Sequence, residues 1–136
     1  KLDMQKCFNS VNIHLNKGGL FIFDMNSDFK INSIGNSIKC NNIGKDILIR
    51  INSRKKNIWI SEIILLKKVN GWKQFYERHV EKAYRIDIVK DMLKKAGFEV
   101  IFACSDFGFN KIKKDSMRWF FVCRKRDSKY LISSLR

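Results

Sequence analysis

The chain of 136 residues fits one domain with a modest core. Hydrophobic residues make up 45% and charged residues 30% of it. No apolar run approaches the roughly 20 residues that cross a bilayer, which excludes a membrane-spanning helix. The formal net charge of +15 invites a nucleic-acid interpretation, but the basic residues are spread along the whole length and are not gathered into one stripe.

The first predicted element is a helix over residues 3–16, because apolar side chains recur there at spacings of three and four. Gly18 and Gly19 then supply a turn. The following run, Leu20 to Phe23, is apolar at every position, and it stops on Asp24. An apolar run without alternation predicts a central strand that is buried on both faces.

The middle of the chain predicts an antiparallel meander. Residues 46–52 and 57–66 are rich in β-branched and aromatic side chains, as strands are, and a polar turn separates them. Asn70-Gly71 is a hairpin turn signal. It leads into a third run over residues 72–84, whose side chains alternate between two faces.

The last third of the chain predicts a helix and two strands. Residues 86–96 form an amphipathic helix, and Gly97 is placed to end it. Strands are predicted over residues 98–104 and 118–124, with a loop over residues 106–117 between them.

The four cysteines are scattered and form no C-x-x-C pair. Neither His14 nor His79 lies at metal-ligand spacing from them, so no metal site is predicted. We expect the cysteines to be core thiols and the compartment to be the reducing cytoplasm. The sequence begins at Lys1 without a signal-peptide pattern, and we expect it to be a fragment.

These pieces, in this order, resemble the C-terminal half of a class I S-adenosylmethionine-dependent methyltransferase. The phrase from Leu15 to Asp24 is similar to the helix end, Gly-Gly turn and fifth strand of that family. A second phrase is similar to small bacterial members with a β-rich lid, and its matching residues are Glu77, His79, Tyr84, Leu93, Ala96, Gly97 and Phe98. The strand from Trp119 to Arg124 looks like the antiparallel seventh strand.

The resemblance implies an α/β fold, namely the C-terminal half of a Rossmann-like methyltransferase sheet with an antiparallel β-meander as a lid insertion. Residues 1–28 and 85–126 would form the partial core, with a helix, strand 5, a helix and strands 6 and 7. Residues 29–84 would form the lid over the substrate. Residues 127–136 would be a tail.

The resemblance also implies a cofactor that this chain does not hold alone. The family binds S-adenosyl-L-methionine through a Gly-rich loop after its first strand and an acidic residue after its second. Both would lie upstream, so the cofactor-binding residues are unknown. We expect the isolated chain to be inactive. A partner is expected to cover the exposed sheet edge, either the missing N-terminal half or a second copy in a homo-oligomer.

The candidate site residues are those that the resemblance would place on the side of the methyl acceptor. The candidates for catalysis are Asp24, Glu77 and His79. The candidates for substrate binding are Met25, Asn26, Arg50, Trp59, Tyr76, Arg78, Glu81 and Tyr84. The acceptor would be a small molecule that the sequence does not identify.

Each candidate keeps a structural alternative. Asp24 is equally suited to forming a hydrogen bond with a loop backbone. The structural alternative for Glu77, His79 and Glu81 is a cluster of solvated side chains that satisfy one another. For the aromatic candidates Trp59, Tyr76 and Tyr84, packing within the lid is the favoured interpretation. Arg50 and Arg78 are equally suited to facing solvent. The alternative function is a basic α+β module that binds nucleic acid or a protein partner, although no zinc-finger, KH or RNP signature is present.

Overall fold

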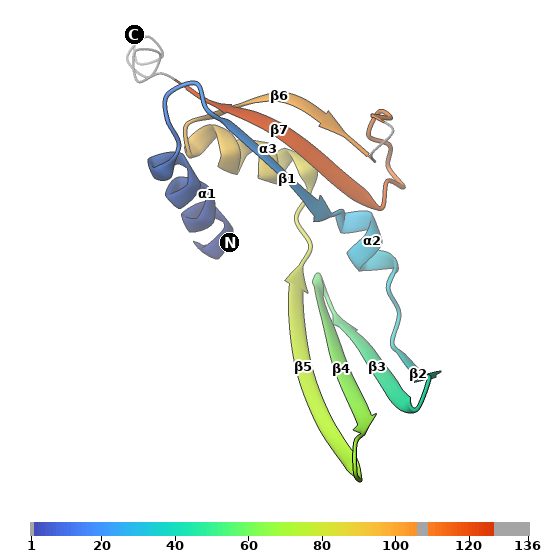
Figure 1. Cartoon of the computed structure of the whole chain (residues 1–136). Coiled ribbons are helices and arrows are strands. Elements are labelled where there is room, and N and C mark those ends of the chain that lie inside the picture. Colours follow the sequence, from blue (N-terminus) through green and yellow to red (C-terminus); the bar gives the residue numbers. More distant parts are fainter. Residues whose placement is uncertain (1, 106–108, 127–136) are drawn as a thin grey trace, which may run out of the picture. The chain divides into compact units, whose positions relative to one another are not determined.

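The computed structural model describes residues 2–105 and 109–126, and it divides the chain into two compact units (Figure 1). Unit 1 combines Lys1–Ser27 with Tyr84–Arg136, and unit 2 is Asp28–Ala83. The predicted tail over residues 127–136 lies outside the described residues.

In its described residues, unit 1 is a three-stranded sheet with two helices. Its elements are α1 (Leu2–His14), β1 (Leu20–Asn26), α3 (Ile86–Lys95), β6 (Phe98–Cys104) and β7 (Arg118–Lys125). The strand order is β1-β7-β6, and β7 pairs antiparallel with both neighbours. The predicted antiparallel orientation of the last strand is confirmed. The strands β1 and β6 therefore run parallel to each other on either side of it.

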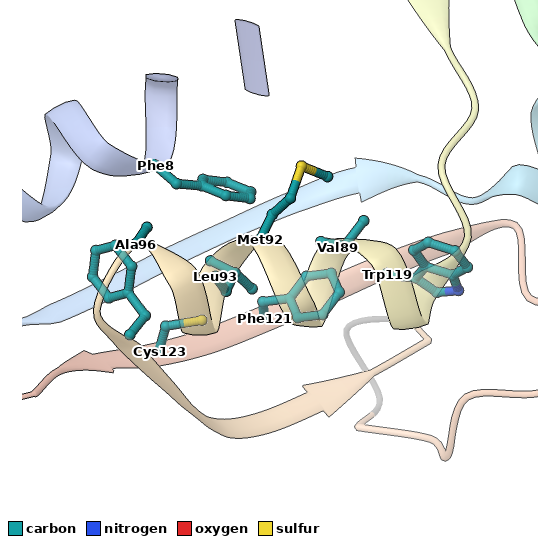
Figure 2. Packing of buried hydrophobic residues seen from close by; sticks show 9 residues of the cluster. Phe8, Val89, Met92, Leu93, Ala96, Trp119, Phe121 and Cys123 are labelled. Atoms are coloured by element: carbon teal, nitrogen blue, oxygen red, sulfur yellow. The ribbon is translucent and has the colours of Figure 1, made fainter. Parts of the chain in front are cut away.

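The core of unit 1 lies between this sheet and the helices. Phe8 comes from α1, while Val89 and Leu93 come from α3 (Figure 2). They pack against Phe121 and Cys123 of β7, and all five side chains are at most 3% exposed. Burial raises the pKa of the Cys123 thiol to about 11.

The predicted burial of β1 on both faces is wrong. Phe21 and Phe23 point to the core, where Phe23 stacks on Phe121 with the ring centroids 5.0 Å apart. Leu20 and Ile22 remain 51% and 67% exposed. The reason is that the helices of unit 1 contribute to a core on one face, and β1 is an edge strand of the described sheet.

The turn from α1 to β1 is held by a lysine of β7. The α1 helix ends at His14, two residues before the predicted end. The Nζ of Lys125 donates hydrogen bonds to the carbonyl oxygens of Asn12 and Leu15, at 2.6 and 2.8 Å. Both carbonyls lie at the C-terminal end of the helix, where backbone oxygens lack intrahelical partners and a cation is stabilising.

Unit 2 is a four-stranded antiparallel meander preceded by one short helix. Its elements are α2 (Asp28–Ser33), β2 (Ser37–Ile43), β3 (Asp46–Lys55), β4 (Ile58–Lys68) and β5 (Trp72–Lys82). The strand order follows the sequence. The predicted meander is confirmed, and β2 and α2 are additions to it.

Candidate functional site

The candidates Asp24, Met25 and Asn26 lie within β1 and not after it. The predicted strand ended at Phe23, whereas β1 continues to Asn26, because Asp24, Met25 and Asn26 pair with residues of β7. Asp24 and Asn26 share one face of the strand, and Met25 points to the opposite face and packs against the core.

Arg118 joins the two polar candidates of β1. It lies directly opposite Asn26, forms an ion pair with Asp24 through Nε and donates from Nη1 to Asn26 Oδ1 at 3.3 Å. The side chains of Arg118 and Asp24 are 46% and 36% exposed, so water screens the pair. Arg118 thus fixes the direction in which the Asp24 carboxylate points. No local sequence pattern indicates this role for Arg118, since only the pairing of β1 with β7 brings it there.

A recess of about 450 Å³ opens in the connection between β6 and β7. It is lined by Ser105, Asn110, Lys113, Asp115, Ser116 and Met117. The backbone N–H of Ser27 donates to the carbonyl oxygen of Met117 at 3.1 Å, which ties the end of β1 to the rim of this recess. None of the predicted candidates lines it. Its residues have no periodic pattern that sequence reasoning could have used.

The strand register sorts the candidates of unit 2 onto two faces, because directly opposite residues lie on the same face of a sheet. We call one the polar face; it holds the odd-numbered residues of β2, β4 and β5 and the even-numbered residues of β3. Its candidates are Arg50, Trp59, Glu77, His79 and Glu81. The other face, which we call the apolar face, carries Tyr76 and Arg78.

The polar face carries a chain of hydrogen bonds across three strands. Trp59 Nε1 donates to Asn52 Oδ1 at 3.2 Å, and Asn52 Nδ2 donates to Ser37 Oγ at 3.1 Å. Ser61, which lies opposite both Asn52 and His79, is only 6% exposed. The indole of Trp59 is therefore fixed in direction by a side-chain partner.

His79 and Glu77 form a pair on β5. Their Nε2 and Oε2 atoms are 3.2 Å apart, and the side chains are 53% and 71% exposed. When Nε2 carries the proton and donates it to Glu77, Nδ1 is an unprotonated acceptor, and which nitrogen is protonated depends on the tautomer. A histidine oriented by a carboxylate in this way can act as a general base.

Tyr76 and Arg78 belong to a different set of contacts. The hydroxyl of Tyr76 donates to Glu62 Oε1 at 2.5 Å, and this bond is the main reason that the pKa of Tyr76 is raised. Arg78 lies opposite the same Glu62 in the register. These two candidates therefore cannot line the surface that holds His79. The remaining candidate, Tyr84, packs against the core of unit 1.

Metal and membrane sites are not evident in the part of the chain that the structure describes. No cluster of three or more His, Cys, Asp or Glu side chains could hold a metal ion there. No helix among those residues is long and apolar enough to span a membrane. Cys104 and Cys123 are buried as predicted, whereas Cys7 and Cys40 are exposed and so are not core thiols.

The architecture defines the class of fold. An antiparallel strand lies between two parallel ones, two helices contribute to one core, and a four-stranded antiparallel sheet is inserted after the first strand. This is a mixed α/β fold with an antiparallel insertion.

Solved structures share this fold. An S-adenosylmethionine-dependent methyltransferase from Clostridium acetobutylicum ATCC 824 is similar with a TM-score of 0.83 and 24% identity, over 92% of this chain and 52% of that chain. The CcbJ methyltransferase from Streptomyces caelestis is similar with a TM-score of 0.69 and 15% identity, over 89% of this chain and 52% of that chain. The sugar N-methyltransferase KedS8 from Streptoalloteichus sp ATCC 53650 has a TM-score of 0.62 and 16% identity, over 90% of this chain and 49% of that chain.

These similarities confirm, at the level of the fold, the resemblance to the C-terminal half of a class I methyltransferase. The chain spans about half the length of the solved structures that it matches. No protein-family profile matches the sequence. No curated protein matches it either.

Proposed function

We propose that this chain is the acceptor-side half of an S-adenosylmethionine-dependent methyltransferase that acts on a small molecule. The observation that carries the proposal is the fold, with its TM-score of 0.83 to a methyltransferase of which the chain covers 52%. The name of KedS8, a sugar N-methyltransferase, supports a small-molecule acceptor.

The described residues do not fit a site for S-adenosyl-L-methionine by themselves. A cofactor loop of this fold follows a strand and opens a helix. The glycines of the described residues stand elsewhere: Gly18, Gly19, Gly35 and Gly97 lie between a helix and the strand that follows it, and Gly44 and Gly71 lie in hairpin turns. The cofactor is therefore proposed for a complete fold, in which the other half would supply the glycine-rich loop.

The uncovered side of unit 1 supports the need for such a partner. Leu20 and Ile22 of β1 are more than half exposed, and on the same sheet Ile101 and Phe102 are 45% and 40% exposed. Sheets of the doubly wound class carry helices on both faces, and an open edge strand presents unpaired backbone groups. The rest of a class I fold would cover this edge and this face.

The proposed chemistry uses the polar face of unit 2. His79, oriented by Glu77, would accept the proton that an oxygen or nitrogen acceptor loses on methylation. Arg50, Trp59 and Glu81, on the same face, would bind the acceptor. In unit 1, Asp24 and Asn26, held by Arg118, form a separate set of polar groups that could bind a substrate. In this proposal Met25, Tyr76, Arg78 and Tyr84 have structural roles.

The experiment that tests the function is calorimetric titration of S-adenosylhomocysteine into this chain and into a version extended upstream by the remainder of a class I fold. We expect binding by the extended protein alone. Binding by neither protein would overturn the methyltransferase proposal. An RNA-binding assay across a salt series would then come first, because the net charge of +15 is the observation that favours nucleic acid.

The role of His79 is tested by His79→Ala in the extended protein. Loss of a general base lowers kcat/KM by about 10²- to 10⁴-fold. Lys73→Ala is the matched control, since it lies on the same face and strand but outside the proposed site. Unchanged kcat/KM in His79→Ala would exclude the histidine as the base.

A further inference from the structure

The polar face of unit 2 carries positive and negative side chains on different strands. The residues concerned lie in three consecutive rows across the sheet, where a row is a set of directly opposite residues. In these rows Lys39 of β2 and Arg50 and Arg54 of β3 are basic, whereas Glu77 and Glu81 of β5 are acidic. The β4 strand between them contributes no charged side chain to the three rows. Since neighbouring strands lie ~4.8 Å apart, two strand spacings, or ~10 Å, separate the charges of β3 from those of β5.

Two of the basic side chains repel each other and have no counterion in the protein. Lys39 and Arg50 lie directly opposite each other on β2 and β3, and both are exposed. Like charges in this position destabilise a strand pair. Within the described residues neither side chain forms a salt bridge or a hydrogen bond. An anionic group of a ligand would remove this repulsion, and a guanidinium binds carboxylate and phosphate groups through two N–H donors at once.

The β5 side of the polar face suits an amine. Glu77 and Glu81 flank His79 on the same face of this strand, and Glu77 Oε2 lies 3.2 Å from His79 Nε2. Two carboxylates attract an ammonium group, whereas a neutral hydroxyl gains no such Coulomb attraction. An imidazole can take the proton of that ammonium group and leave an amine with a free lone pair. The acidic strand therefore favours nitrogen over oxygen as the acceptor atom.

The middle row of the three joins the basic side to the acidic side through polar side chains. It consists of Ser37, Asn52, Ser61 and His79. The amide of Asn52 is already engaged by Trp59 and Ser37. In contrast, Ser61 is only 6% exposed, and its hydroxyl forms no hydrogen bond with any other described residue. A buried hydroxyl without a partner is unfavourable, and a polar group of a ligand lying along this row would supply that partner.

We propose that the methyl acceptor is a zwitterion, an amine that also carries a carboxylate or phosphate group, and that it lies along the middle row with its anion at Lys39 and Arg50 and its amine at His79. This inference rests on the proposed function and names its substrate class. The ammonium group gives one proton to His79. The neutral amine then uses its lone pair to form the N–C bond, as the C–S bond of the sulfonium breaks and leaves both electrons on sulfur. The products are a methylated ammonium group and a neutral thioether.

The test is an NMR titration of the whole chain that follows its three indole N–H signals. Trp59 lies on the polar face, Trp72 on the apolar face and Trp119 in the core of unit 1, so the last two are internal controls. The zwitterionic probes are 6-aminohexanoate and glucosamine 6-phosphate, and their relative affinities distinguish a carboxylate from a phosphate as the anion. We expect at least one probe to shift the Trp59 signal and leave the other two unchanged, with a Kd on the order of 1 mM.

Matched probes and variants test the two charged ends separately. Hexanoate and hexylamine each lack one charge of 6-aminohexanoate, as glucose 6-phosphate and glucosamine each lack one of glucosamine 6-phosphate, and each should bind ~10-fold more weakly than its zwitterion. Arg50→Gln should raise the Kd of the zwitterion by a similar factor. Lys55→Gln is the control, because Lys55 is exposed on the same strand but on the apolar face, and it should leave Kd unchanged. Lys39→Gln replaces Arg50→Gln if the latter does not fold, as judged by circular dichroism.

This titration contains no cofactor, so its failure is distinct from failure of the S-adenosylhomocysteine titration. If the extended protein binds S-adenosylhomocysteine but no zwitterion shifts the Trp59 signal of the chain or of the extended protein, the acceptor class is overturned and the function stands. Equal affinity for a zwitterion and its singly charged analogues, or equal Kd values for Arg50→Gln and Lys55→Gln, would overturn it as well. Zwitterion binding without S-adenosylhomocysteine binding by the extended protein would overturn the function and the acceptor role, but not the site.

Discussion

The burial of one thiol, that of Cys123, links the stability of unit 1 to pH. The side chain is fully buried among core residues of the sheet and the helices, and burial raises its pKa from 9.0 to about 11. The thiol is neutral when protonated, so the folded state keeps its proton at pH values where the unfolded chain has lost it. The stabilisation from this group is complete below pH 9 and is lost as the pH rises from 9 to 11.

We therefore expect the free energy of unfolding of the native chain to fall by up to about 3 kcal/mol more than that of Cys123→Ala over this range. Urea titrations at fixed pH values between 8 and 11 measure the free energy of unfolding of the native chain and of the variant. The variant starts lower because it loses packing, and the difference between the two curves should shrink as the pH rises. Parallel curves would show that this thiol does not carry the effect.

At the same scale, the sequence predicted some of the candidate contacts and not others. Alternation along residues 72–84 separated Tyr76 and Arg78 from Glu77 and His79, and the register of β5 agrees. The contact of Asp24 with Arg118 was out of reach, because 94 positions separate the two residues and their pairing depends on where β7 enters the sheet. Local patterns give the face of a side chain, while its partner across strands requires the topology.

At the scale of elements, the helices and most strands were predictable because each has a strong period of its own. The exceptions are instructive. The β2 strand begins with Ser and has one Lys and three Cys or Asn residues between its two isoleucines. This composition has weak strand propensity, and the strand forms by pairing with β3. The apolar run from Leu20 to Phe23 predicts a strand buried on both faces, but half of its side chains are exposed in the structure. Hydrophobicity shows what a strand can bury, and the neighbouring elements determine what it does bury.

The contact between Lys125 and the end of α1 gives a prediction at this scale. Its ammonium group donates to two helix-terminal carbonyl oxygens in a partly buried position. We expect Lys125→Met to lower the free energy of unfolding by about 1.5–3 kcal/mol, because charged hydrogen bonds are lost and the carbonyls stay desolvated. Urea denaturation measures the change.

Arg124→Met is the control for this substitution. Arg124 is the neighbouring residue, is exposed and belongs to the opposite face of β7. Its change should stay within about 0.5 kcal/mol, as for most surface positions. If Lys125→Met lowers the free energy of unfolding no more than Arg124→Met does, water replaces the lysine as the hydrogen-bond donor at the helix end.

At the scale of the whole molecule, unit 1 is discontinuous and unit 2 is contiguous in the chain. Unit 2 pairs neighbours along the sequence, β2 with β3, β3 with β4 and β4 with β5. Unit 1 pairs its first strand with its last described one, across 94 positions between Asp24 and Arg118. The two units therefore differ in the loop-closure entropy that their sheets require.

Because unit 1 is discontinuous, its strands emerge from the ribosome at different times during synthesis. At ~5–20 residues per second, β1 leaves the exit tunnel roughly 5–20 s before β7, the strand that must lie beside it. The hairpins of unit 2 emerge complete within that interval. For that time Phe21 and Phe23 lack β7, and for the first part of it they also lack α3, so the nascent chain presents an exposed apolar segment. During this interval β1 would be a binding site for chaperones that recognise short apolar stretches.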